Sequence, residues 1–254
     1  MEDWEKALNT FLESWKEKEE VVGALVCGSY VVGNPTKHSD IDVHIILKEG
    51  TTWRERGNKV VNGFLIEYFA NPPEQIIVYF TEDHEGYTQD SFIQFLTGKI
   101  MFDDGSIEKL KSKAEEFYNK RFNKQPKVVE ELNKYAVWDL NDNVENAFEE
   151  KDSHFWFVYH NSLNKLIEIY CKFKQYPIIK FDKSLGILSD EKVRKKYMLS
   201  EFPDAELVAL AQKALVVEKK DDALQLFKEL SNHVLDSMGG FNIDGWKLKS
   251  DVDA

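Results

Sequence analysis

The chain has 254 residues and a net charge of −12, from 33 Lys and Arg against 45 Asp and Glu. Hydrophobic residues make up 43% of it, which excludes bulk disorder, and no apolar run reaches the roughly 18 residues of a membrane span. The acidic balance argues against a protein that binds long nucleic-acid backbones, but it does not exclude a small anionic ligand. With only Cys27 and Cys171 and a charged N-terminal segment, we expect no disulfide scaffold, no export and a reducing cytoplasm.

The first half of the chain alternates short helix and strand signals. Apolar side chains at helical spacing predict an opening helix that ends by residue 16. Asn62-Gly63 fits a two-residue type I′ turn and predicts a hairpin, and Asn71 before two prolines is typical of a helix cap. Strands are expected over 21–26, 40–47, 59–61, 64–69 and 99–102, with short helices after residue 73 and over 90–96.

From residue 106 onward the strand signals nearly vanish and long helical patterns replace them. We predict helices over 106–122, 127–149, 153–175, 188–199, 204–217 and 221–238. The break at residues 123–126 is the best domain boundary. The predicted fold class is therefore α+β: an N-terminal mixed-sheet domain over 1–124 and an all-helical bundle domain over 125–254.

One segment carries the residues of a catalytic site: Gly28-Ser29, a spacer of ten residues, then Asp40 and Asp42. Residues two apart on a strand point to the same face, so the two carboxylates project side by side. Adjacent carboxylates raise each other's pKa unless a cation lies between them, and Mg²⁺ prefers such oxygen ligands. Gly28 allows a ligand to approach the backbone, and Ser29 offers a hydroxyl and an N–H to a phosphate oxygen.

A third carboxylate, Glu67, lies in the middle of an apolar strand. A charge in that setting needs a partner, and a metal site would supply one if the Glu67 strand neighbours the aspartate strand. The plainer alternative is a salt bridge on an exposed strand face. His44 shares the predicted face of the aspartates, and we interpret it as a structural residue rather than a metal ligand.

These residues resemble the signature of the polymerase-β-like nucleotidyltransferase superfamily. That signature is an apolar strand ending in Gly-Ser, a spacer of this length, an Asp-apolar-Asp strand and a later apolar-acid-apolar strand, here Ile66-Glu67-Tyr68. The layout is most similar to bacterial stand-alone enzymes of the aminoglycoside and lincosamide adenylyltransferase type, which add a helical C-terminal domain. The motifs cover about residues 20–75, and the layout covers the whole chain.

The resemblance implies transfer of a nucleoside monophosphate, by default AMP from ATP, to a hydroxyl of a small acceptor such as an antibiotic, with release of pyrophosphate. It implies that Asp40 and Asp42 hold Mg²⁺, with two ions expected, and that Glu67 acts as a further ligand or as general base. Gly28 and Ser29 inherit contacts with the nucleotide phosphates. The 125–254 domain is expected to bind the acceptor.

The helical half contributes one further group of candidates. A local basic cluster contains Lys165 and Lys180, either of which could contact a phosphate of the nucleotide, although a solvated positive face explains the cluster equally well. The full cluster is Lys165, Lys172, Lys180 and Lys183. Tyr159 and Asn164 lie on a strongly apolar helix, where core packing is the favoured interpretation.

Two other functions stay open at this point. The same catalytic core could modify a protein or a tRNA, as in toxin–antitoxin systems, although the negative charge speaks against RNA. A non-catalytic nucleotide-binding module is the third interpretation, and the complete acidic set disfavours it. The acceptor, the preferred nucleotide and the oligomeric state do not follow from the sequence.

Overall fold

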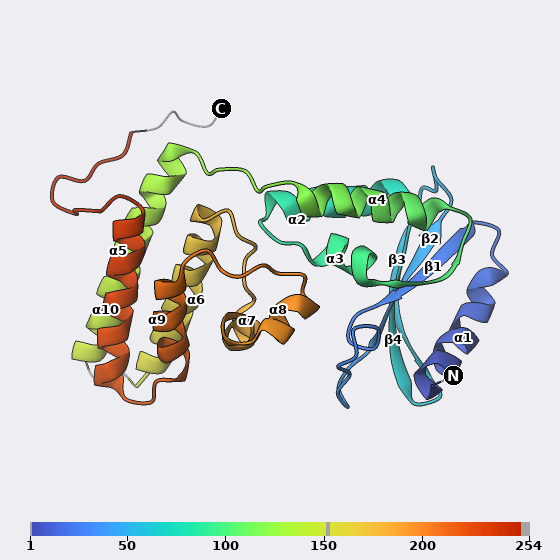
Figure 1. Cartoon of the computed structure of the whole chain (residues 1–254), viewed down its shortest axis with the longest axis horizontal. Helices are drawn as coiled ribbons and strands as arrows, with labels where there is room; N and C mark the ends of the chain where they lie inside the picture. Colours follow the sequence, from blue (N-terminus) through green and yellow to red (C-terminus); the bar gives the residue numbers. More distant parts are fainter. Residues whose placement is uncertain (1, 151–152, 250–254) are drawn as a thin grey trace. The chain divides into compact units, whose positions relative to one another are not determined.

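A computed structural model describes residues 2–150 and 153–249 (Figure 1). The chain divides into two compact units, residues 1–121 and 122–254. This division falls three residues before the boundary expected at residue 124. Among the described residues, no helix is long and apolar enough to cross a membrane.

The first unit is built on a five-stranded mixed sheet with strand order β3-β4-β2-β1-β5. Strands β2 and β4 are parallel, and the other neighbouring strands are antiparallel. In chain order the elements are α1 (Asp3–Lys16), β1 (Val21–Cys27), β2 (Ile41–Leu47), β3 (Glu55–Val61), β4 (Phe64–Asn71), α2 (Pro73–Glu85), α3 (Asp90–Thr97), β5 (Lys99–Asp103) and α4 (Ser106–Asn119).

Each face of this sheet is covered by helices, and strand alternation decides which side chains meet them. Alternate β2 residues such as Val43 and Ile45 join the buried face of α1, which includes Phe11, in one core. The intervening residues face the opposite side, where His44 contacts Phe95 of α3. Asp42 therefore lies on the face that α2, α3 and α4 partly cover (Figure 1).

Of the predicted turn at Asn62-Gly63 and the predicted cap at Asn71, the structure shows only the turn. Asn62 and Gly63 both have positive φ, 50° and 84°, as the type I′ hairpin between β3 and β4 requires. The cap expected at Asn71 is wrong: Asn71 is the last residue of β4, and the N-cap of α2 is Pro72. Pro73 opens the helix because its fixed φ suits the first turn and its missing N–H costs nothing there.

The second unit is all-helical in its described residues, so the predicted α+β fold class is confirmed. Asp190 divides the helix expected over 188–199, because its side chain accepts a hydrogen bond from the Lys192 backbone and caps a new helix. The elements are α5 (Lys127–Glu149), α6 (Phe155–Phe173), the 3₁₀ turn η1 (Phe181–Lys183), α7 (Ser184–Ser189), α8 (Glu191–Lys196), α9 (Ala205–Val216) and α10 (Lys220–Ser237).

A polar junction around Asp204 ties three helices of this unit together. The Asp204 carboxylate accepts hydrogen bonds from the Tyr170 hydroxyl of α6, from the Leu207 backbone N–H of α9 and from His233 Nε2 of α10, the last at 2.9 Å. Burial raises the pKa of Asp204, but these donors outweigh it and hold the pKa at about 2. Asp204 is therefore a satisfied structural carboxylate. Tyr159 is also structural: it is fully buried and donates to the Ala214 carbonyl.

Candidate functional site

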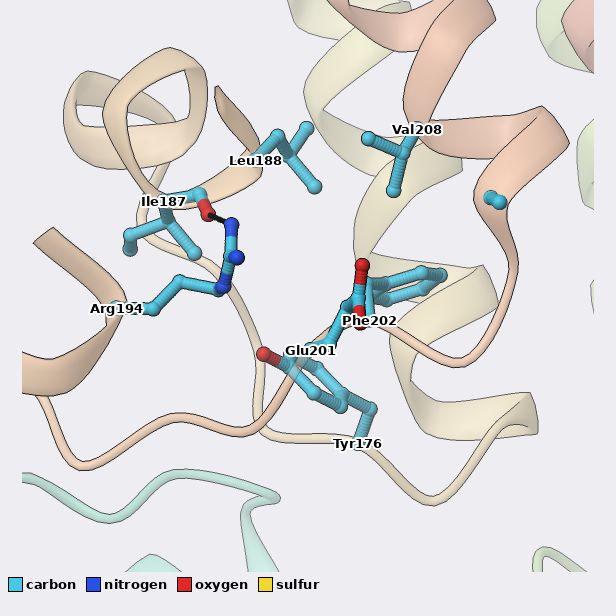
Figure 2. A pocket seen from close by; sticks show the side chains of 8 residues that line it. Tyr176, Ile187, Leu188, Arg194, Glu201, Phe202 and Val208 are labelled. Carbon is cyan, nitrogen blue, oxygen red and sulfur yellow. Dashed lines mark hydrogen bonds between the residues drawn. The ribbon is translucent and has the colours of Figure 1, made fainter. Parts of the chain in front are cut away.

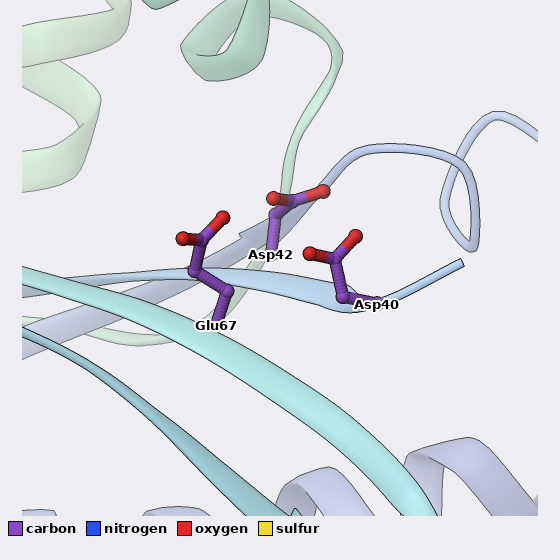
Figure 3. A group of neighbouring side chains, drawn as sticks. All are labelled: Asp40, Asp42 and Glu67. Atoms are coloured by element: carbon purple, nitrogen blue, oxygen red, sulfur yellow. The ribbon is translucent and has the colours of Figure 1, made fainter. Parts of the chain in front are cut away.

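The parallel pairing of β2 with β4 brings the three predicted acids together. Asp42 lies directly opposite Glu67 in the register, and Asp40 immediately precedes β2. One carboxylate oxygen of each residue lies within 4.8 Å of the others, and all three side chains rise from the same face of the sheet (Figure 3). The strand adjacency that the sequence left open is therefore present.

The turn after β1 lies against this acidic cluster. Gly28 follows Cys27, which pairs with Asp42, and its backbone has φ of +75°. A Cβ at Gly28 would lie 2.0 Å from Asp42 Oδ2, a separation no side chain can occupy. The Gly28 carbonyl accepts hydrogen bonds from Val31 and Val32, which fold the chain that follows into a tight turn. Glycine is thus required here both by φ and by the close approach to Asp42.

Burial and mutual repulsion both act on the acids of the cluster. Burial is the largest cause that raises the pKa of Asp42 to about 7, and the negative charges of Asp40 and Glu67 add to it. Burial also raises the pKa of the neighbouring Cys27 thiol, with Asp42 and Asp40 adding to the shift, so Cys27 is a neutral thiol rather than a nucleophile. The protein therefore holds three acids close together against their mutual repulsion.

The donor set fits a hard divalent cation. Carboxylate oxygens are the ligands that Mg²⁺ accepts, and a cation among them would relieve the repulsion that raises the Asp42 pKa. All three residues are partly exposed, so an ion and a substrate phosphate could reach them from solvent.

The comparisons with known proteins agree with this geometry. A family model described as a nucleotidyltransferase domain matches residues 8–169, more than half of the chain. The chain belongs to the nucleotidyltransferase domain family. The resemblance implied by the Gly-Ser, Asp-apolar-Asp and apolar-acid-apolar motifs is thereby confirmed, and the protein is a nucleotidyltransferase.

Among solved structures, a nucleotidyltransferase-like protein from Exiguobacterium sibiricum 255-15 is similar, with 13% identity and a TM-score of 0.46. The match covers 92% of this chain and 75% of that chain. At this level the likeness supports no finer assignment. No curated protein gives a significant match to the chain.

The sequence did not predict that Arg56 lies beside the acids of this nucleotidyltransferase. Arg56 Nη2 of β3 lies 2.8 Å from Glu67 Oε1, and the Arg56 guanidinium lies 4.9 Å from the centre of the Phe69 ring. Glu67 therefore belongs both to the acidic cluster and to a salt bridge, the two alternatives that the sequence left open. The strand was expected only from residue 59, whereas β3 begins at Glu55.

His44 is buried on the face of the sheet that carries the acids. Its Nε2 lies 2.9 Å from Gln94 Oε1, and its ring stacks on Phe69. Burial lowers the pKa of His44 to about 4, although the Gln94 hydrogen bond opposes this, so the imidazole is neutral at pH 7. His44 thus packs the sheet below the acids without adding charge.

The two lysine candidates belong to the second unit. Lys165 Nζ lies 3.2 Å from Glu168, which also pairs with Lys172, and Lys183 pairs with Asp182. Lys180 precedes η1. Much of the basic cluster is therefore neutralised locally by acids of its own unit.

A small pocket of about 80 Å³ also lies in the second unit (Figure 2). Arg194 borders it and donates to the Ile187 carbonyl at 3.2 Å, while apolar side chains such as Leu188 and Val208 form another wall. Its volume is well below the roughly 300 Å³ at which small-molecule sites begin, so it is too small for a nucleotide.

Proposed function

We propose that the protein is a Mg²⁺-dependent nucleotidyltransferase that moves a nucleoside monophosphate from a nucleoside triphosphate, ATP by default, to a hydroxyl of a small acceptor. One observation carries the proposal: oxygens of Asp40, Asp42 and Glu67 lie within 4.8 Å of one another beside the Gly28 turn. Three acids at this spacing suit a site for cations and phosphates far better than a solvated strand edge.

In this proposal each group has a stated task. Asp40 and Asp42 hold the divalent cations, which would neutralise the charge of the phosphates. Gly28 and Ser29 bring backbone and hydroxyl donors close to the triphosphate. Glu67 completes the cation site or accepts the proton of the attacking hydroxyl. A bond then forms between the acceptor oxygen and the α-phosphorus, the bond from that phosphorus to the leaving pyrophosphate breaks, and inversion requires the two oxygens to be in line.

The remaining parts of the proposal concern the rest of the chain. Residues 125–254 would bind the acceptor, for which an antibiotic is one candidate, and Lys165 or Lys180 would contact a phosphate. The free, buried thiols of Cys27 and Cys171 suit a reducing cytoplasm.

The test is the release of pyrophosphate from ATP with and without Mg²⁺, in the presence of a panel of hydroxyl-bearing acceptors that includes aminoglycosides and lincosamides. We expect Mg²⁺-dependent release that Asp40→Ala and Asp42→Ala abolish. Glu13→Ala removes a carboxylate from the exposed face of α1 and serves as the matched control. Activity that survives the loss of both aspartates would overturn the proposal.

The class of acceptor requires a separate experiment. Cell lysate incubated with isotopically labelled ATP and the enzyme can be divided into small molecules and macromolecules and analysed by mass spectrometry. A labelled small molecule supports the proposal, whereas a nucleotidylated protein or tRNA would replace its acceptor while leaving the chemistry in place.

A further inference from the structure

Strand β3 presents hydrogen-bond donors on the face of the sheet that carries the acids. Arg56 is paired with Phe69 and Asn58 with Glu67 in the β3–β4 register, so both side chains share the Glu67 face. Arg54 lies immediately before β3, and its guanidinium reaches Tyr79 of α2, a helix on the same side of the sheet. The alternate residues face the other side, where Glu55 accepts a hydrogen bond from Tyr68.

Both guanidinium groups are loosely held, and that of Arg56 reaches the acidic cluster. Arg56 contacts Glu67 Oε1 at 2.8 Å, and its side chain is 70% exposed, whereas the Glu67 side chain is only 19% exposed. Arg54 Nη1 donates to the Tyr79 hydroxyl at 2.6 Å, and within the described ranges no carboxylate pairs with Arg54. Most of the five N–H donors of each guanidinium are thus available to a ligand.

The presence of two arginines, rather than lysines, at this place indicates recognition of an oxyanion. Only four of its 33 basic residues are arginines, and two of these four are Arg54 and Arg56. The planar guanidinium fork matches the oxygens of a phosphate or a carboxylate in a way that the lysine ammonium does not. The Arg56 guanidinium is exposed on one side, so a substrate oxyanion can use its remaining N–H donors without displacing the partly buried Glu67.

We propose that Arg54 and Arg56 form an oxyanion subsite next to the acidic cluster, which binds a phosphoryl or carboxylate group of a substrate. The inference rests on the proposed function, because catalysis at the cluster is what brings a substrate to β3. Along the sheet, Gly28 follows the end of β1, the acids lie on or next to β2 and β4, and this subsite lies on and immediately before β3. The oxyanion belongs either to the triphosphate or to an anionic acceptor, and the same chemistry recognises both.

This inference changes the expected acceptor. The net charge of −12 and the antibiotic resemblance favour a cationic acceptor, whereas Arg54, which pairs with no carboxylate in the described ranges, and the exposed donors of Arg56 would disfavour a cation placed next to them. If the triphosphate does not occupy the subsite, the acceptor carries an anionic group near the hydroxyl that is modified.

The experiment uses isothermal titration calorimetry on the full chain. The variants are Arg54→Met, Arg56→Met, the double variant and Arg56→Lys. Lys59→Met is the matched control, because it removes a positive charge from the same strand on the opposite face. One titration uses the Mg²⁺ complex of the non-hydrolysable nucleotide α,β-methylene-ATP, and a second adds inorganic phosphate to the free and to the nucleotide-loaded protein.

The two titrations separate the sources of the oxyanion. A loss of nucleotide affinity of about tenfold or more in the double variant, with Arg56→Lys intermediate and Lys59→Met unchanged, assigns the subsite to the triphosphate. Unchanged nucleotide affinity with lost phosphate binding assigns it to an anionic acceptor. If neither affinity changes in the double variant, the subsite does not exist.

Failure of the proposed function has a different signature. A wild-type protein that does not bind the Mg²⁺–nucleotide complex would contradict the function itself. In that case the phosphate titration of the free protein still tests the subsite. It shows whether phosphate binding depends on Arg54 and Arg56. Glu67→Gln provides a second measure: it releases Arg56 from its carboxylate and should strengthen phosphate binding.

Discussion

Asp42 and Asp204 are both partly buried carboxyl groups, one in each unit of the chain, and their neighbours differ in kind. Asp204 is surrounded by donors: a tyrosine hydroxyl, a backbone N–H and an imidazole. These donors hold its pKa at about 2 although burial opposes them. Asp42 has two further acids beside it, and burial together with their charges raises its pKa to about 7.

The opposite pKa shifts mean that the ionised Asp204 stabilises the folded protein, whereas the ionised Asp42 destabilises it. Both oxygens of Asp204 accept hydrogen bonds, so ionisation favours the native state. Ionisation of Asp42 disfavours the native state until a cation arrives. An arrangement that costs stability and lies in an accessible position is typical of a functional site.

The largest expected effect comes from removing the charge of Asp42. Asp42→Asn keeps the size of the side chain but removes a cation ligand, so we expect pyrophosphate release to fall by at least about 10²–10³-fold. The same substitution should stabilise the metal-free protein at pH 8, because it removes one of three repelling charges. Steady-state kinetics and thermal unfolding in EDTA measure the two effects. If Asp42→Asn lost stability and kept its activity, Asp42 would be a structural carboxylate like Asp204, and the contrast between the two residues would be wrong.

The pH dependence of stability should have opposite signs at the two residues. The folded pKa of Asp42 lies above the ordinary value of 3.8, so the native state binds the extra proton between about pH 4 and 7. The stability of the metal-free protein should therefore fall as pH rises through that window, by at most about 1.4 kcal/mol per pH unit from this group. Chemical denaturation at several pH values checks this. A slope identical in Asp42→Asn would contradict the assignment to Asp42.

At Asp204 the substitution Asp204→Asn should be destabilising. The amide has a single oxygen, so it cannot accept from both the Leu207 N–H, which binds Oδ1, and the Tyr170 hydroxyl, which binds Oδ2, and we expect a loss of about 2 kcal/mol in the free energy of unfolding. Because the folded pKa is depressed, the contribution of Asp204 is present above about pH 4 and disappears toward pH 2. Urea denaturation at pH 7 and pH 3 measures both. Equal losses at the two pH values would show that charge is not the cause.

The smallest expected effects come from alanine substitutions at two glycines, which separate a steric clash with Asp42 from backbone strain. Gly28 and Gly33 both have positive φ, 75° and 83°, but a Cβ at Gly33 meets nothing within 4 Å. Each alanine substitution should cost about 1 kcal/mol of strain. Only Gly28→Ala should also displace the Asp42 carboxylate and lower kcat, by about tenfold or more. Equal kcat values for the two variants would contradict the claim that the close approach of Gly28 to Asp42 matters for catalysis.

The local features of the site could be predicted from the sequence, whereas the long-range features could not. The Asp-apolar-Asp spacing and the Asn62-Gly63 turn depend only on neighbouring residues. The place of Glu67 depended on which strands pair, and β2 pairs in parallel with a strand that is not next in sequence. Arg56 was missed because residues 54–58 combine charges with a glycine and lack the β-branched pattern of a strand.

The most direct test of the account is the binding of Mn²⁺, as a spectroscopic substitute for Mg²⁺, measured by electron paramagnetic resonance at pH 8. The account predicts that the wild-type protein binds Mn²⁺, that Asp42→Asn loses this binding and that Asp204→Asn does not. It also predicts that binding in the wild type weakens as pH falls below 7, because a proton then occupies Asp42. Undiminished Mn²⁺ binding by Asp42→Asn would contradict the central claim that the three acids form a cation site.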